Sequence, residues 1–436
     1  MAGKENRDDL PFDEKVRIFS YDYLIFCNHL ASHDITWPGF TKKLYLKLSY
    51  SSQLLEDFLD FHGAKNNKNW YFYRELAAAI RHLSACSYSQ KHISNRLPLY
   101  DLRDTDDFKL EGEVTRDFLN QSLINIAPVI LKEAHRLKIP VPPDSIKQVD
   151  FPSVKTAQLL DYDIDDQDPR QHKEHIVKIA SELLNIYKNF SPIEFYKSYD
   201  RKEIRAIVPE RINEAVVRQV EMQLHNLQST FDTYVIHGGY RFGNRKLKEL
   251  RGLFSVLLHL LQGTGRLLHF YERHLYQAGY KSTYKRIQNR LLKLIDPDVL
   301  LDRTINYGLF FASQFLTTAR DVAREILNEN IERSSVQVGV PVKLGFHSRP
   351  CLLVARIVQH FGGQVELCIG EDRFDASSVL DLQWAGGKIQ KENLTRVTFE
   401  GDVRALADID ILSSVNYGED IIGKDIALPD ELRYLR

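Results

Sequence analysis

The chain has 436 residues, which is longer than one hydrophobic core usually serves, so the length predicts two or three domains. Hydrophobic residues make up 43% and charged residues 27% of the sequence, which is the balance of a globular protein and not of a disordered or fibrous one. The formal net charge of −1 excludes recruitment of nucleic acid or of an anionic membrane by overall charge. Any charged partner must therefore be recognised locally.

The cysteines and the apolar segments predict a cytoplasmic protein. The four cysteines are scattered without a C-x-x-C pair, which is typical of reduced thiols and not of a disulfide framework or a zinc site: Cys27, Cys86, Cys351 and Cys368. The first 19 residues are polar and acidic and lack the apolar core of a signal peptide. The most apolar window, 252–263, is too short to cross a bilayer, so we expect no membrane insertion.

The first 138 residues predict an all-helical domain. Apolar residues follow helical spacing at 53–63, 74–86 and 119–137, and Pro128 is expected to kink or break the last of these helices. The composition then changes, because 139–173 contains a proline-rich stretch followed by an acidic one. This segment is interpreted as a linker or surface excursion.

A second helical domain is predicted for 174–333. Its first helix would line one face with Ile176, Ile179, Leu183 and Ile186, and further helices are expected near 210–228, 245–262, 265–279, 283–294 and 299–329. The GTGR stretch at 263–266 contains G-x-G but follows an apolar helix instead of a strand. It therefore indicates a helix–helix turn and not a dinucleotide site, and no cofactor is expected.

A different pattern begins at residue 334. Alternating or β-branched stretches predict strands at 335–344, 364–370, 372–376 and 394–401. Helices are expected after Arg349, at 378–387, where glycines would stop the helix, and at 403–412. This order predicts an α+β domain over 334–415, with helices on one face of a mainly antiparallel sheet, followed by a tail at 416–436.

The stretch GFHSRP at 345–350 places an imidazole and a guanidinium at the mouth of a helix. Ser348 is a suitable N-cap residue, and Pro350 fits the first helical turn. His347 would then lie where the helix dipole favours an anion, and Arg349 adds a charged fork that matches phosphate oxygens. Gly345 permits a backbone conformation that a side chain would block. A neutral imidazole in such a place can attack phosphorus and carry a phosphoryl group.

This stretch resembles the phosphohistidine loop of HPr, the phosphocarrier family of the bacterial phosphoenolpyruvate:sugar phosphotransferase system. The family pattern of glycine, apolar residue, histidine, small residue, arginine and proline is matched here by Gly345, Phe346, His347, Ser348, Arg349 and Pro350. Downstream, ASSVLDLQWAGG at 376–387 is similar to the family's regulatory-serine helix. The resemblance spans 335–415 and implies an HPr-like open-faced β-sandwich. It also implies that His347 is the phosphoacceptor and that Arg349 stabilises the phosphate.

Ser378 has two interpretations. It aligns with the family serine that a dedicated serine kinase phosphorylates in some lineages, so the resemblance implies regulatory phosphorylation at this position. Ser378 and Asp381 also fit the S-x-x-[DE] capping-box pattern, which accounts for the serine without any modification. Ser377 is equally acceptable as a cap by its position.

The resemblance implies a histidine phosphocarrier, which is a stoichiometric intermediate and not a true catalyst. His347 would accept a phosphoryl group from an enzyme I-like donor and pass it to an acceptor protein, enzyme IIA-like or a regulator, in a regulatory phosphotransferase branch. Residues 1–333 have no counterpart in HPr. The alternative is therefore a regulatory or scaffold protein whose helical region binds an effector while the HPr-like domain senses phosphorylation state. The helical region shows no compact catalytic motif.

Other polar clusters are interpreted as structural. His29 and His33 have the i, i+4 spacing of metal ligands, and His172 and His175 flank HKEH, but no carboxylate completes a zinc motif, so no metal site is predicted. The acidic stretch 161–172 begins like an EF-hand loop but lacks its glycine and its final glutamate, so it is read as a solvated linker. The basic run at 241–251 is interpreted as a solvated helix face.

Overall fold

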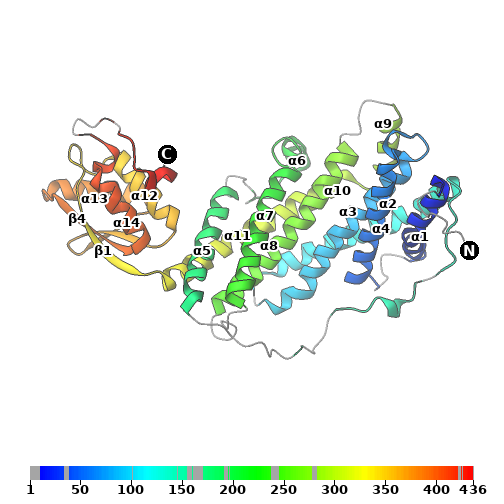
Figure 1. Ribbon diagram of the computed structural model, residues 1–436, viewed down its shortest axis with the longest axis horizontal. Coiled ribbons are helices and arrows are strands. Elements are labelled where there is room, and N and C mark those ends of the chain that lie inside the picture. The colour runs from blue at the N-terminus through cyan, green and yellow to red at the C-terminus, as the bar shows by residue number, and fades with distance from the viewer. Residues whose placement is uncertain are drawn as a thin grey trace, which may run out of the picture. The chain divides into compact units, whose positions relative to one another are not determined.

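The structure of the chain is a computed structural model, shown in Figure 1. It describes residues 10–33, 39–100, 102–144, 146–154, 160, 170–190, 195, 197–236, 245–276, 282–420, 424 and 426–435. The EF-hand-like aspartates of the acidic stretch, Asp161, Asp163 and Asp165, lie outside the described residues.

The described chain is mostly helical and carries a small four-stranded antiparallel sheet near its C-terminus, as the sequence predicts. It divides into two compact units that alternate along the sequence. The helical unit comprises 1–164, 191–226 and 251–316, and the sheet unit comprises 165–190, 227–250 and 317–436. Among the described helices, none combines the length and the apolar character that crossing a bilayer requires.

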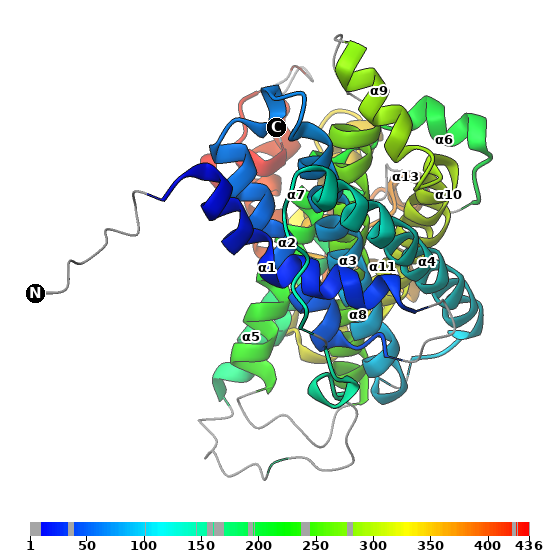
Figure 2. The ribbon, with the colours of Figure 1, turned by 90° about the vertical axis from the view of Figure 1, so that its right-hand side faces the viewer.

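The helical unit begins with four long helices that pack side by side: α1 (Phe12–Ala31), α2 (Lys42–Phe61), α3 (Tyr71–Arg96) and α4 (Asp106–Arg136) (Figure 2). Each contacts the next along the chain, and α4 returns to contact α1. Pro128 lies inside α4, which continues past it, so of the predicted kink or break the break is wrong. The proline removes one backbone hydrogen bond, but the neighbouring side chains of Ala127 and Ile130 are fully buried, and their packing holds the helix together.

One of the remaining helices is continuous where the sequence predicted two helices joined by a turn. Their bounds are α5 (Arg170–Phe190), α6 (Arg201–Ile207), α7 (Glu214–Phe231), α8 (Arg245–Phe270), α9 (Ser282–Leu291), α10 (Pro297–Asp302) and α11 (Phe310–Asn330), with π-helical segments at Asp232–Ile236, Tyr271–Tyr276 and Arg303–Leu309. Short 3₁₀ turns lie at Ala64–Asn66, Leu97–Leu99, Gln148–Asp150, Asn416–Gly418 and Asp430–Leu435. The predicted turn at 263–266 is wrong, because α8 runs through it. A Cβ at Gly263 would lie 3.3 Å from Sγ of Cys86, so this glycine lets α8 approach α3 closely.

The sheet unit contains β1 (Arg333–Gly339), β2 (Val365–Ile369), β3 (Asp372–Asp375) and β4 (Arg396–Asp402), in the order β1-β4-β2-β3 with every pair antiparallel. Helices α12 (Ser348–Phe361), α13 (Val379–Lys391) and α14 (Val403–Ser414) alternate with the strands in the predicted order. Two details differ. Strand β1 ends at Gly339, and α13 continues through Gly386 because this glycine packs against the loop before α12, where a Cβ would lie 2.7 Å from the carbonyl oxygen of Phe346.

The core of the sheet unit lies between one face of the sheet and the three helices α12, α13 and α14. Alternate strand residues contribute to it, and they are joined by the apolar sides of the helices; examples are Val365, Leu367, Phe399, Val354, Leu382 and Ile409. Helix α5 adds a further contact, because Oγ of Ser181 donates to the carbonyl of Phe361 and Leu184 packs against Gly362. The sheet unit therefore includes helical residues far upstream of residue 334.

Candidate functional site

His347 occupies the N-cap of α12 in an extended backbone conformation, with φ −84° and ψ −175°. Ser348 is the first helical residue and is exposed, so the expectation that it caps the helix is wrong; the cap needs non-helical dihedral angles, which His347 adopts. No side chain caps the first turn. The N–H groups of a first turn have no acceptor within their own helix, so this end of α12 favours an anion.

Hydrogen bonding and packing hold the backbone of the loop before α12 in place, while the side chain of His347 stays accessible to solvent. Gly345 has a φ of +62°, which accounts for the glycine, and its carbonyl accepts a hydrogen bond from the N–H of His347 at 2.8 Å. Phe346 is buried, with its ring centroid 5.3 Å from that of Tyr417. The side chain of His347 keeps 27% of its surface exposed. The loop thus holds the backbone of His347 while its ring remains accessible.

Glu419 is the acidic partner of this histidine. Its two carboxylate oxygens lie 3.1 and 3.2 Å from Nε2 of His347, and its side chain is only 7% exposed. A carboxylate can only accept a hydrogen bond, so Nε2 carries the proton in the neutral ring and the lone pair is on Nδ1. The described part of the chain offers Nδ1 no hydrogen-bond partner. This is the arrangement of a nucleophilic imidazole with an orienting base.

A tight turn after α14 places Glu419. Asn416, Tyr417 and Gly418 all have positive φ values, of 48°, 56° and 74°. Oη of Tyr417 donates to the carbonyl of Gly339 at 2.8 Å, and Nδ2 of Asn416 donates to the carbonyl of Glu419 at 3.1 Å. Left-handed conformations at non-glycine residues are costly and are concentrated at functional sites. The sequence placed residue 416 onward in a tail of unclear structure, so it gave no signal for Glu419.

Arg349 lies beside the same carboxylate. Its Nη2 donates to the carbonyl of Gly418 at 3.2 Å, and its Nε is 4.0 Å from Glu419. Pro350 is buried in the first turn, as the pattern predicts. The structure therefore brings His347 and Arg349 together on one side of α12 and adds Glu419 to them.

Ser378 is the N-cap of α13, and Ser377 is not. Oγ of Ser378 accepts a hydrogen bond from the N–H of Asp381 at 3.2 Å. The reciprocal half of a capping box is absent, because the N–H of Ser378 donates to the carbonyl of Asp375 instead. The capping interpretation is confirmed, and phosphorylation of Ser378 stays a prediction.

The weaker histidine pairs have ordinary surroundings. Nδ1 of His33 lies 2.6 Å from the carbonyl of His29 at the end of α1, and burial lowers the pKa of His29 to about 4. The ring of His175 stacks on that of Tyr234, with centroids 4.0 Å apart. The side chain of His172 lies outside the described residues.

Comparisons with family models, with curated proteins and with solved structures found no match for this chain. No relative therefore supplies an activity or a partner for it. Its function has to be argued from the residues around His347.

Proposed function

We propose that the segment from residue 334 to Glu419 is an HPr-like histidine phosphocarrier domain of the open-faced β-sandwich type. The observation that carries this proposal is the position of His347 at the start of α12, with Nε2 on a buried carboxylate. The order of strands and helices and the loop GFHSRP agree with the resemblance. The segment would act as a stoichiometric carrier in a regulatory phosphotransferase branch.

The transfer step follows from the tautomer of His347. The lone pair of Nδ1 attacks phosphorus, the bond between phosphorus and the donor's nitrogen breaks, and the proton on Nε2 stays in place. The ring then carries a positive charge, which the Glu419 carboxylate stabilises at 3.1 Å. The phosphoryl oxygens would be received by first-turn N–H groups of α12 and by the guanidinium of Arg349. Transfer to the acceptor reverses these steps.

A protein donor suits the surface beside His347. Large apolar side chains are exposed on the two helices next to the loop: Leu352 on α12, and Leu380 and Trp384 on α13. Helix α13 lies against the loop through Gly386. An enzyme I-like donor and an enzyme IIA-like or regulatory acceptor would both dock there, so they would use the domain in turn.

The experiment is a phosphotransfer assay on the full-length protein. With a bacterial enzyme I and ³²P-phosphoenolpyruvate, the wild type should gain one acid-labile, base-stable phosphoryl group per chain. His347→Ala should gain none. The matched control is His360→Ala, an exposed histidine at the other end of α12, which should be labelled like the wild type. Absence of label in the wild type, or unchanged label in His347→Ala, would refute the proposal.

A further inference from the structure

Three histidines from distant parts of the sequence meet inside the helical unit. They are His82 on α3, His269 near the end of α8 and His274 in the π-helical segment Tyr271–Tyr276, and one ring nitrogen of each lies within 4.8 Å of the others. Their ring centroids are 4.5, 5.8 and 6.0 Å apart. Zinc–nitrogen bonds of about 2.0–2.1 Å place the centroids of imidazoles on one ion about 5 Å apart. The observed spacing is therefore close to that of a three-histidine metal site.

The π-helical segment explains how His269 and His274 reach the same place. In a regular α-helix two residues five positions apart point about 140° away from each other, since each residue turns the chain by about 100°. A π-helical turn closes its hydrogen bonds five residues apart, which brings positions i and i+5 onto one side. The segment follows α8 directly, so the widened turn falls between the two histidines. Such turns occur frequently at functional sites.

Hydrogen bonding leaves metal-binding nitrogens available on all three rings. Nδ1 of His269 lies 2.8 Å from a carboxylate oxygen of Glu214, and Nδ1 of His274 lies 2.7 Å from one of Glu75. Nη1 of Arg74 also lies 3.3 Å from Nδ1 of His274, but the closer carboxylate can only accept a hydrogen bond. In both neutral rings Nδ1 therefore carries the proton, and Nε2 keeps its lone pair. His82 is 1% exposed, and neither of its ring nitrogens has a hydrogen-bond partner among the described residues. A buried imidazole without partners is costly, and coordination of an ion would satisfy it.

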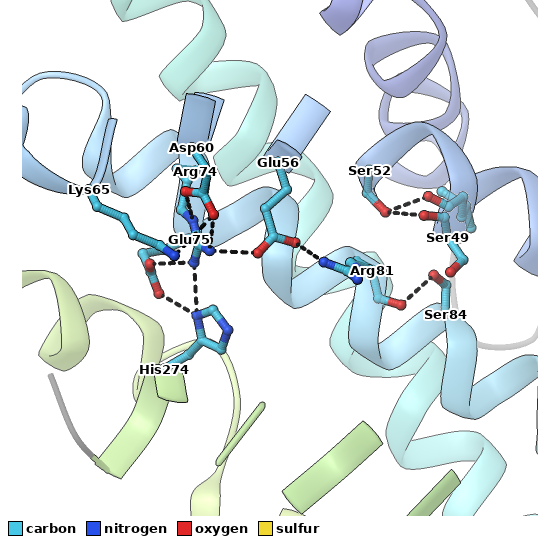
Figure 3. A network of polar contacts seen from close by, with 11 residues as sticks. Ser49, Ser52, Glu56, Asp60, Lys65, Arg74, Glu75, Arg81, Ser84 and His274 are labelled. Carbon is cyan, nitrogen blue, oxygen red and sulfur yellow. Dashed lines mark hydrogen bonds and ion pairs between the residues drawn. The ribbon is translucent and has the colours of Figure 1, made fainter. Parts of the chain in front are cut away.

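A buried charge network fixes the carboxylate behind His274 (Figure 3). Nη1 of Arg74 donates to Glu75 at 3.0 Å, and the other guanidinium nitrogens of Arg74 bind Asp60 at 2.7 and 2.8 Å and Glu56 at 2.7 Å. Arg74, Glu75 and Glu56 are all under 5% exposed. These contacts hold the Glu75 carboxylate behind His274 in one place. Carboxylates held behind ligating histidines orient the rings in this way.

One member of the cluster, His269, lines a cavity of about 480 Å³. His269 and Glu214 lie in its wall together with two arginines, Arg218 and Arg266. This is the size of a small-molecule site. Catalytic metal sites keep a fourth position open, whereas structural zinc sites are closed by four protein ligands.

We propose that His82, His269 and His274 bind one divalent first-row transition-metal ion. Three imidazoles suit zinc, iron, copper or nickel. The proposed site does not involve His347. No sequence motif in the helical unit predicts it.

The test is metal titration of the full-length protein after removal of metals with a chelator. Zinc should bind in a 1:1 ratio by calorimetry and raise the unfolding temperature, and cobalt should give the visible absorption bands of a tetrahedral site. His82→Gln and His269→Gln should each lower zinc affinity by at least 100-fold. Glu75→Gln keeps the side-chain shape and should lower it by about 10-fold to 100-fold.

The matched controls are a second histidine pair on the same two helices. His92 on α3 and His259 on α8 lie with ring centroids 3.8 Å apart. Among the described residues, no third histidine joins this pair in a group that could hold a metal ion. His92→Gln and His259→Gln should bind zinc like the wild type. Circular dichroism checks the fold, and the less buried His269 supplies the decisive variant if His82→Gln does not fold. Absence of 1:1 binding in the wild type, or equal losses in the ligand and control variants, would overturn the proposal.

Discussion

The carboxylate of Glu419 lies 3.1 Å from Nε2 of His347. The same carboxylate is 4.0 Å from Nε of Arg349, so one buried acid faces both residues of the candidate phosphohistidine loop. In the neutral ring this contact places the proton on Nε2 and the lone pair on Nδ1. The nitrogen that would accept the phosphoryl group is thereby specified.

Glu419→Gln should slow phosphorylation of His347 about tenfold, because the amide still accepts the Nε2 proton but no longer stabilises the positive ring, a loss of about 1.4 kcal/mol. The measurement is the rate of label incorporation, with Glu371→Gln in the exposed β2–β3 turn as the control. Nitrogen-15 NMR of the phosphorylated wild type should show the phosphoryl group on Nδ1. Attachment to Nε2 would contradict the assigned role of Glu419.

Arg349→Lys should slow transfer by roughly one or two orders of magnitude. Lysine keeps the charge but loses the planar fork that binds two phosphate oxygens, a contact worth about 1.5–3 kcal/mol. The rate should be measured at saturating donor so that chemistry and docking are separated. Unchanged rates would mean that first-turn N–H groups alone bind the phosphate.

Local patterns predicted the strands and helices of the sheet unit from β1 to α14. The strand-helix order and the loop at 345–350 follow from alternation, helical spacing and cap residues that are close together in sequence. Glu419 could not be found in this way. Its position depends on a turn in which Asn416 and Tyr417 adopt left-handed conformations, and on the bond from Tyr417 to Gly339 on a distant strand.

The helical unit shows where local patterns mislead. Gly263 and Gly265 predicted a turn, but glycine inside a helix also permits close packing against a neighbouring helix. The close approach of Gly263 to Cys86 on α3 shows that packing, and not a turn, is its role here. The histidine cluster was missed for a related reason. His82 is almost 190 residues from His269, and the spacing of His269 and His274 matches no α-helical face until the π-helical segment is known.

Ser378→Ala should lower the free energy of unfolding of the sheet unit by about 1 kcal/mol, because the N–H of Asp381 loses its capping acceptor. Ser377→Ala is the matched control, and it should change stability by no more than a few tenths of a kcal/mol because Ser377 does not cap the helix. Urea unfolding followed by circular dichroism measures both. Equal effects of the two substitutions would contradict the assigned cap.

Gly362→Ala should destabilise the sheet unit first through backbone strain and second through a steric clash. Gly362 has a φ of +76°, and an added Cβ would overlap Cδ1 of Leu184 on α5. Gly370→Ala is the control for the first effect alone, since it has a φ of +59° and no atom within 4 Å of the added Cβ; it should cost about 1–2 kcal/mol. Gly362→Ala should cost at least about 2 kcal/mol more.

The contact with α5 can be isolated by a double-mutant cycle. Leu184→Ala removes the overlapping methyl group, so Gly362→Ala combined with it should cost about 1–3 kcal/mol less than the sum of the two single substitutions. Urea unfolding of the four proteins gives the coupling free energy. Additive effects would mean that α5 does not contact α12 at this position in solution.

The free energy of unfolding should fall as the pH is lowered below neutrality because of the half-buried pair His92 and His259. Burial, together with nearby positive groups, lowers the pKa of His92 to about 3, and burial lowers that of His259 to about 4. In the unfolded chain both imidazoles titrate at about pH 6.5. Between that pH and about 4, the unfolded state binds protons that the folded state does not. The free energy of unfolding therefore rises with pH across this window. His92→Gln should reduce the slope by about one proton, whereas His225→Gln, at an exposed position, should leave it unchanged. The free energy of unfolding, measured in urea at a series of pH values with a chelator present, gives the slope. A slope equal in His92→Gln and the wild type would show that this imidazole is protonated in the folded protein.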